Sequence, residues 1–392
     1  MKRLCEKYAA KLSNQGLAAP GAPIIGGLDA ELVWNRHDPR IEHLAGIFDA
    51  MSINSLVFAK PAEPYATIID FLARKHPETI RPEDTETRTF LHDIPVCHEF
   101  TTKAISAALK RRKAVIIPGE GIASFGTVSP EQGFVFYSST IFACTVLFFS
   151  EYLAAARRNY LDEEFRSTFA RVVAALPSPR TDIPNLAPAP LADEETVLAA
   201  MTEAGRAVVE YGLVDSFFGN ISYRLDDTIY ISQTGSSLDE LEGCIDPCPM
   251  DGSTTAGLTA SSELSAHEGV YRNADALCML HGHPKFSVIM SMNCDKKDCP
   301  NRGQCHIKCT ECRTVDGVPI VPGEVGTGPT GLCNTLPPAV ASSGAAIVHG
   351  HGVFTSGQPD FTQAFKRLLE TENRCRELYF EQISALGGWN RK

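Results

Sequence analysis

The chain has 392 residues, 44% of them hydrophobic, and a formal net charge of -11 at pH 7. This length exceeds the usual size of one domain, so we expect two domains with large cores. The acidic balance argues against a general surface for nucleic acid or for an anionic membrane, and it favours small-molecule chemistry. Thirteen cysteines without a secretory signal indicate a cytoplasmic protein whose thiols serve packing or metals.

Two segments organise the first half of the chain. The longest apolar stretch, residues 133–149, is too short and too rich in Ser and Thr to span a bilayer comfortably, so it predicts a buried helix. Residues 176–192 contain five prolines and almost no charge, which is typical of an extended linker. We therefore expect domains at 1–175 and 193–392, joined by that linker.

The second domain is predicted to open with a helix from Asp193, because acidic residues precede apolar residues at helical spacing. Alternating residues at 219–232 then predict two strands around a turn at Asp226 and Asp227. Further on, "LTASSELSAHEGVY" predicts a second helix start. Ser261 and Ser262 could simply cap that helix, or they could hold an anion at its N-terminus and leave the next residue, Glu263, free to act.

A histidine pair follows an apolar strand at "CMLHGHP", residues 278–284. Side chains alternate along a strand, so His281 and His283 point to the same side, as two ligands of one metal ion would. The segment "VHGHGVF" supplies a third ligand from His349 or His351. Imidazoles favour zinc, with iron, cobalt or manganese as weaker choices.

The chain also resembles itself. Residues 116–126 align without gaps with residues 347–357, and Glu120 stands where His351 does. A weaker match aligns residues 58–69 with 278–289 and sets Pro61 over His281 and Glu63 over His283. The first half is thus predicted to be a degenerate copy of the second.

Taken in order, "GNIS", "TGSSLDEL", "ASSE", "HGHP", "PGEVGTGPTGL" and "HGHGVF" resemble the class II aldolase/adducin family over about 200 residues. The resemblance implies two tandem three-layer α/β/α domains with mainly antiparallel central sheets, the second of them catalytic. It implies zinc on His281, His283 and His351, and Glu263 as the acid/base residue, which can also bind zinc before substrate. It implies a substrate phosphate on Gly219, Asn220, Thr234, Gly235, Ser261 and Ser262.

The implied activity is a zinc-dependent aldehyde-lyase that acts on a small phosphorylated hydroxy-ketone or sugar phosphate through an enediolate. A dry pocket that raised the pKa of Glu263 would suit this residue to moving the proton. The family's aldolases use a tyrosine after the first histidine cluster as proton donor, but this chain has none between Tyr271 and Tyr379. Epimerase, decarboxylase and dehydratase chemistry therefore remain alternatives.

A non-catalytic, adducin-like binding protein is the other class of function. We favour catalysis, because all three histidines and Glu263 are present in the second domain. Since family sites form between subunits, we expect a dimer or tetramer that binds neither nucleic acid nor membrane.

A cysteine-rich insert interrupts the second domain at residues 294–312. Five cysteines on a charged loop with a Cys-x-x-Cys pair indicate a metal more than packing. Structural zinc is favoured over an iron-sulfur cluster or free thiols. The candidate ligands are Cys294, Cys299, Cys305, Cys309 and Cys312, with His306 as a spare.

Overall fold

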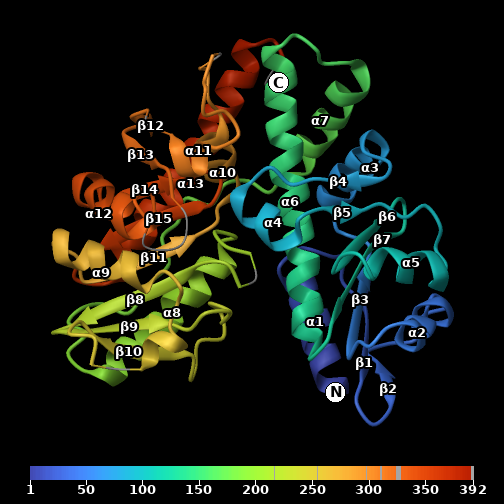
Figure 1. Ribbon diagram of the computed structural model, residues 1–392, viewed down its shortest axis with the longest axis horizontal. Helices are drawn as coiled ribbons and strands as arrows, with labels where there is room; N and C mark the ends of the chain where they lie inside the picture. The colour runs from blue at the N-terminus through green and yellow to red at the C-terminus, as the bar shows by residue number, and fades with distance from the viewer. Residues whose placement is uncertain (216, 254, 297, 310, 324–327, 390–392) are drawn as a thin grey trace. The chain divides into compact units, whose positions relative to one another are not determined.

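The computed structural model shows two compact units (Figure 1). The first comprises Met1–Ser178 together with Ile383–Lys392, and the second comprises Pro179–Gln382. The structure describes residues 1–215, 217–253, 255–296, 298–309, 311–323 and 328–389.

The second unit is built on an eight-stranded sheet with the order β10-β9-β8-β11-β15-β14-β13-β12. Neighbouring strands are antiparallel except for β13 and β14, so the prediction of a mainly antiparallel sheet is confirmed. The strands are β8 Asn220–Leu225, β9 Thr228–Ser232, β10 Ile245–Pro249, β11 Cys278–Gly282, β12 Arg313–Val315, β13 Val318–Val321, β14 Ala345–Val348 and β15 Gly352–Gly357.

Helices cover both faces of this sheet (Figure 1). On one face, residues of α9 and α12 form a core with Ile231, Met279 and Phe354 of the strands. On the other, the α13 residue Phe361 packs against Tyr223 of β8. The helices are α8 Glu194–Glu210, the 3-10 turn η1 Ala256–Leu258, α9 Leu264–Asn273, α10 Lys285–Met292, α11 Cys305–Lys308, α12 Leu332–Ser343 and α13 Phe361–Ala385.

Local chemistry explains how this unit begins. Asp193 caps α8 and exchanges hydrogen bonds with Thr196 in a capping box, so the predicted helix is confirmed. The predicted strands pair as the hairpin β8–β9, and Asp226 adopts a positive φ of 52° in its two-residue turn. This hairpin carries Asn220 into the sheet directly beside β11.

The first unit has a five-stranded antiparallel sheet with the order β2-β1-β3-β7-β6 and a separate pair, β4–β5. Helices α2 and α5 share a core with one face of the sheet, and α6 packs against strands β3 and β7. The elements are α1 Lys2–Asn14, β1 Ile24–Leu28, β2 Leu32–Trp34, α2 Ile41–Ala50, β3 Ser55–Ala59, α3 Tyr65–Lys75, β4 Thr79–Ile80, α4 Thr85–Leu91, β5 Ile94–Pro95, α5 Thr102–Leu109, β6 Ala114–Ile117, β7 Gly121–Gly126, α6 Pro130–Arg157 and α7 Glu163–Ala175.

Helix α6 contains the apolar stretch at 133–149, and it is long and apolar enough to cross a membrane. However, 89% of its apolar 18-residue window is buried inside the protein. The prediction of a buried helix is therefore confirmed, and the composition of α6 is that of a core helix.

The two sheets share a strand pattern. The order β2-β1-β3-β7-β6 in the first unit corresponds to β9-β8-β11-β15-β14 in the second, and every neighbouring pair in both series is antiparallel. The hairpin β6–β7 has the register of β14–β15 when Gly126 is matched with Gly357, as the ungapped alignment requires.

The weaker of the two sequence matches is wrong by three residues. Gly126 pairs with Ser55, and Gly357 pairs with Cys278, so Ser55 corresponds to Cys278. The residues that stand at His281 and His283 are consequently Phe58 and Lys60, not Pro61 and Glu63. Two short apolar strands align almost equally well in several registers, and only the hydrogen-bonded ladder decides between them.

We predict that Asp84→Asn stabilises the first unit at pH 7.5 but not at pH 4. Asp84 is fully buried, and its carboxylate accepts the N–H of Thr87 at 2.7 Å to cap α4. Burial raises its pKa to about 6. The charged form is therefore disfavoured in the folded state, and about 3 kcal/mol of stability is lost as the pH rises from 4 to 6.

Asparagine keeps the acceptor and removes this penalty, so the increase in unfolding temperature caused by the substitution should grow as the pH rises from 4 to 6 and stay constant above pH 6. Both tryptophans, Trp34 and Trp389, lie in the first unit, so intrinsic fluorescence follows its unfolding. Asp162→Asn is the matched control, because Asp162 caps α7 from an exposed position. Equal effects of Asp84→Asn at both pH values would contradict the prediction.

Candidate active site

Three histidines converge at the ends of the central strands of the second unit. His281 lies on β11, and His283 follows directly after that strand. His351 lies in the turn between β14 and β15 and donates its N–H to the carbonyl of Val348 at 3.0 Å. Antiparallel pairing of β11 with β15 brings the two clusters together, although 67 residues lie between His283 and His351 in the sequence.

The nitrogens of the three rings are spaced as zinc ligands would be. The Nε2 atom of His281 lies 2.9 Å from that of His283 and 3.2 Å from that of His351. Tetrahedral zinc, with Zn–N bonds of about 2.0–2.1 Å, requires ligand nitrogens about 3.3 Å apart. One potential ligand atom from each histidine lies within 4.8 Å of the others, and all three side chains are buried. This donor set fits a zinc ion.

The protonation state also suits a metal. The Nδ1–H of His281 donates to the carbonyl of Val353 at 3.0 Å, which leaves the Nε2 lone pair facing the other rings. Burial lowers the pKa of His281 to about 4, and burial lowers the pKa of His283 well below its usual value. Neutral imidazoles at pH 7 are the form that binds a metal.

Glu263 completes the cage from the N-terminus of α9. Its Oε1 lies 3.3 Å from Nε2 of His351, and its Oε2 lies 3.6 Å from Nε2 of His281. The amide of Asn220 donates to Oε2 at 2.5 Å, so β8 holds the carboxylate in place. The Glu263 side chain does not cap its own helix and is turned toward the histidines.

The expectation of a raised pKa for Glu263 is wrong. Burial alone would raise it, but His281, His351 and the Asn220 amide outweigh burial and lower the pKa of Glu263 to about 2. The carboxylate is therefore ionised at neutral pH, which suits a proton acceptor or a metal ligand.

The residues assigned to phosphate binding form one connected patch beside this cage. The Ser262 N–H donates to Thr234 Oγ1 at 3.0 Å, and the Glu263 N–H donates to Ser261 Oγ at 3.3 Å. Ser261 is buried and Ser262 is exposed, so the patch runs from the cage to the surface. The amide of Asn220 donates to Glu263, and its assignment to phosphate stays a prediction. Gly219 and Gly235 adopt positive φ angles of 88° and 75° next to this patch.

Gly352 allows the histidine-bearing turns to approach each other. A Cβ atom there would overlap the carbonyl of Gly282 and would lie 2.8 Å from His281 Cε1 and 3.0 Å from His283 Cδ2. Only glycine fits between the two ligand-bearing segments.

Sequence reasoning missed several residues that support the cage. The Phe354 ring stacks on His281 with 3.8 Å between centroids and 5° between planes, and the Phe218 ring stacks on His283 at 5.3 Å and 12°. Glu372 accepts the N–H groups of Phe286 and Ser287 at 2.9 and 2.8 Å, which fixes α10 after the histidine pair. These partners lie far away in sequence, so no local pattern marks them.

The cysteine-rich insert joins α10 to β12. The Arg313 guanidinium donates to the carbonyls of Ser291 and Asn293 at 2.8 Å each and so brings the ends of the insert together. Cys312 is exposed and the other four cysteines are partly buried. Within the described ranges of the chain, the group of side chains close enough to share a metal is the histidine trio. A metal at the insert stays a prediction.

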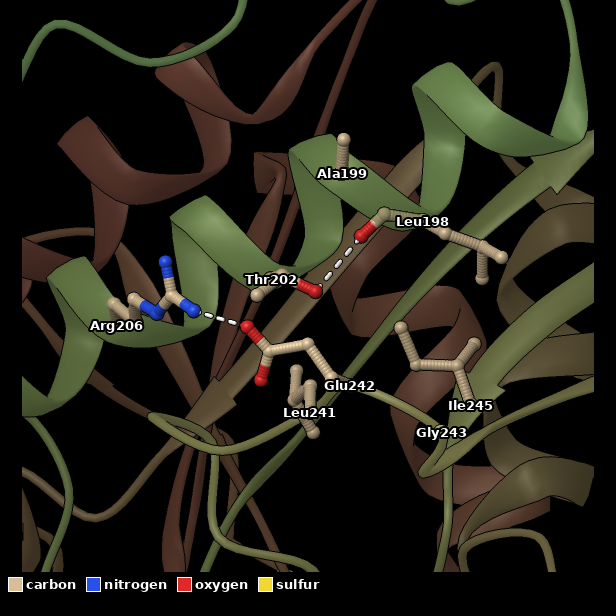
Figure 2. Close-up of a pocket in the computed structure, with 8 residues that line it drawn as sticks. All are labelled: Leu198, Ala199, Thr202, Arg206, Leu241, Glu242, Gly243 and Ile245. Carbon is tan, nitrogen blue, oxygen red and sulfur yellow. Dashed lines mark hydrogen bonds and ion pairs between the residues drawn. The ribbon is translucent and has the colours of Figure 1, made fainter.

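A surface pocket lies elsewhere on the second unit (Figure 2). It has a volume of about 480 Å³, and Arg206 pairs with Glu242 at its edge. It contains none of the predicted site residues, so it is not the candidate site. The lining residues are Leu198, Ala199, Thr202, Arg206, Leu241, Glu242, Gly243 and Ile245.

Residues 199–379 match the family described as Class II Aldolase and Adducin N-terminal domain. This segment contains every histidine of the trio, Glu263 and the phosphate-motif residues. The second unit carries a class II aldolase and adducin domain. The resemblance noted from the ordered sequence motifs is thereby confirmed for this part of the chain, which is hereafter the aldolase/adducin domain.

Several solved structures are similar to about half of the chain. L-fuculose-1-phosphate aldolase from Thermus thermophilus is 21% identical, with a TM-score of 0.39, over 48% of this chain and 95% of its own. A sugar-phosphate aldolase from Thermotoga maritima is 19% identical, with a TM-score of 0.36, over 50% and 98%. An aldolase II superfamily protein from Pseudomonas syringae is 16% identical, with a TM-score of 0.35, over 48% and 74%. Comparison with curated protein sequences gives no significant match.

We predict that Gly352→Ala weakens zinc binding by about tenfold or more, because the new methyl group displaces the ligand rings of His281 and His283. Competition with a chromophoric chelator measures the affinity. Gly328→Ala is the matched control, because a Cβ atom at Gly328 meets no atom within 4 Å. Equal zinc affinity in the two variants would contradict this account of the site.

A second prediction concerns the insert. If its cysteines hold a structural metal, the purified chain contains two metal ions, and Cys309→Ser reduces the content to that of the histidine site. Elemental analysis measures both. Cys333→Ser is the control, since Cys333 lies outside the insert on α12 and is also partly buried. One metal per chain, unchanged by Cys309→Ser, would rule out the insert site.

Proposed function

We propose that the aldolase/adducin domain is a zinc-dependent aldehyde-lyase that acts on a small phosphorylated hydroxy-ketone or sugar phosphate. The observation that carries the proposal is the buried cage of three imidazole nitrogens with an ionised carboxylate 3.3 Å from one of them. A zinc ion there would polarise the substrate carbonyl and stabilise the negative charge that develops on its oxygens.

Glu263 is assigned the proton transfers. The Asn220 amide holds Oε2, and Oε1 lies against Nε2 of His351 on the side of the metal-binding nitrogens, so Oε1 is assigned the proton from the substrate. Glu263 starts as a carboxylate. In the cleavage direction it takes the proton of the substrate hydroxyl that becomes the aldehyde carbonyl, and it returns that proton to the carbon whose bond to the aldehyde has broken. The side chain is 5% exposed, so water is largely excluded from this transfer.

The phosphate end of the substrate is assigned to the patch around Thr234, Ser261 and Ser262. The backbone N–H groups of Ser262 and Glu263 already donate to hydroxyl oxygens, so the serine hydroxyls are the donors that remain for an anion. The N-terminus of α9 adds its dipole. Binding of the phosphate at this end would hold the reacting carbonyl in a fixed orientation.

No tyrosine lies between Tyr271 and Tyr379 to exchange the proton of the aldehyde oxygen, so Glu263 is assigned that proton as well. Epimerase, decarboxylase or dehydratase chemistry on the same cage is the alternative. An adducin-like binding role is the weaker candidate. A protein that only binds a partner does not require three buried histidines and a buried, ionised glutamate in one cluster.

We further propose that the first unit is a degenerate second copy of the domain. The shared strand order supports this proposal. The pairing of residues between strands shows which residues of the first unit stand at the positions of the site residues. The unit could not hold the same metal, because apolar or mismatched side chains replace its donors. The residues at Asn220, His281, His283 and His351 are Ile24, Phe58, Lys60 and Glu120.

We expect the full chain to form a dimer or tetramer in the cytoplasm and to bind neither nucleic acid nor membrane. The acidic net charge and the buried position of α6 agree with that expectation.

We predict that Glu263→Gln lowers lyase activity by about 100-fold or more, because glutamine cannot take the proton. The measurement is aldehyde release from a panel of sugar phosphates by the zinc-loaded chain. Glu268→Gln is the control, since Glu268 lies on the same helix outside the cage. Full activity in Glu263→Gln would reject the assigned base, and aldehyde release by no substrate would favour the alternative reactions.

A further inference from the structure

A buried row of polar side chains lies directly behind Glu263. Glu263, His267 and Tyr271 are spaced by four residues at the start of and along α9, so they share one side of the helix. Asn220 and Ser222 share one face of the adjacent strand β8. Asn220 contacts Glu263, and Ser222 contacts both His267 and Tyr271, so the two rows pair residue by residue.

The hydrogen bonds in this row are short and buried. Ser222 Oγ lies 2.7 Å from Nδ1 of His267 and 2.6 Å from the hydroxyl of Tyr271. Ser222 and His267 are fully buried and Tyr271 is 2% exposed. Burial raises the pKa of Tyr271 well above its usual value, so its phenol keeps its proton and can donate to Ser222. Ser222 can then donate to Nδ1 of His267, which places the imidazole proton on Nε2.

His267 connects this row to the metal ligands as well. Its ring meets the Phe354 ring edge-on, with 6.0 Å between centroids and 72° between planes. The same Phe354 ring stacks on His281. The imidazole therefore contacts Ser222, on the strand that carries Asn220, and Phe354, which stacks on a predicted metal ligand.

An apolar side chain of the same size would fill the position of His267 at a lower free-energy cost of burial. A buried imidazole must be neutral and hydrogen-bonded, and burial lowers the pKa of His267 to about 4. Its Nε2 has no hydrogen-bond partner among the described residues, which adds to the cost of keeping a histidine here. Packing alone does not account for the residue.

We propose that His267 is a positioning residue for Glu263 and His281, held in a single orientation by the Tyr271–Ser222–His267 row. The proposal rests on the proposed function for the role of Glu263. Through Ser222 the row fixes the distance between β8 and α9. That distance in turn sets the geometry of the hydrogen bond between Asn220 and Glu263. Through Phe354 it fixes the ring plane of His281.

The test uses the full chain and cobalt(II) alone as the probe, because its visible absorption reports the number and arrangement of ligands. His267→Phe keeps a ring against Phe354 but loses the bond to Ser222. His267→Asn places an amide where Nδ1 stood and keeps that bond. We expect His267→Phe to bind cobalt about tenfold more weakly with an altered spectrum, and His267→Asn to stay within about threefold with the native spectrum.

Ser222→Ala removes the same bond from the strand side and is the deciding variant where His267→Phe does not fold. Thermal unfolding of each variant shows whether a change in cobalt affinity reflects only a loss of stability. Native cobalt affinity and spectrum in His267→Phe or Ser222→Ala would overturn the proposal, and so would a loss in His267→Asn as large as in His267→Phe. Because no substrate is involved, this result is independent of the lyase test on Glu263.

Discussion

Strand β11 pairs with β15 so that His281 lies opposite Phe354 and Gly282 lies opposite Val353, and this register is the constraint on which the site depends. A shift of one residue would turn His281 to the face covered by α13 and would separate it from Glu263. The register is held on both sides, because β8 pairs with the other edge of β11 and places Asn220 opposite His281. The metal-binding geometry is thus a property of the centre of the sheet, where strands move least.

Burial gives this arrangement its chemistry. Three imidazoles and a carboxylate lie where water is largely excluded, so each must find its partner among the others or in the backbone. The Val353 carbonyl, the Asn220 amide and the stacked phenylalanines meet that requirement. The same burial keeps the imidazoles of His281 and His283 neutral at pH 7, and Glu263 is the ionised member of the group. The protein's own contacts therefore place the four groups that we propose hold a cation.

The sequence predicted what depends on local spacing. The period of two places His281 and His283 on one side, and the motif after β14 supplies His351. The helix after Asp193 and the buried helix α6 follow from patterns within a few residues. What it could not predict depends on partners distant in sequence. The contacts of Glu263 with His281, His351 and Asn220 lower its pKa, against the expectation. The pairing of β3 with β7 shows that the first unit's equivalents of the histidines lie three residues from the positions that the sequence match gave. His267 is intermediate, because its four-residue spacing from Glu263 and Tyr271 is visible in the sequence but its bond to Ser222 is not.

The hydrogen bonds from Arg313 to the carbonyls of Ser291 and Asn293, hereafter the Arg313 clamp, bear on how much the cysteine-rich insert can change. The insert lies within the loop that must close for His351 to reach His283, yet its ends are joined at Ser291 and Asn293. Even without the clamp, the extra residues would raise the entropy cost of closing that loop by only about 0.3 kcal/mol, since this cost grows with the logarithm of length. The insert can therefore vary in length and content as a module, while the ligands on either side keep their places.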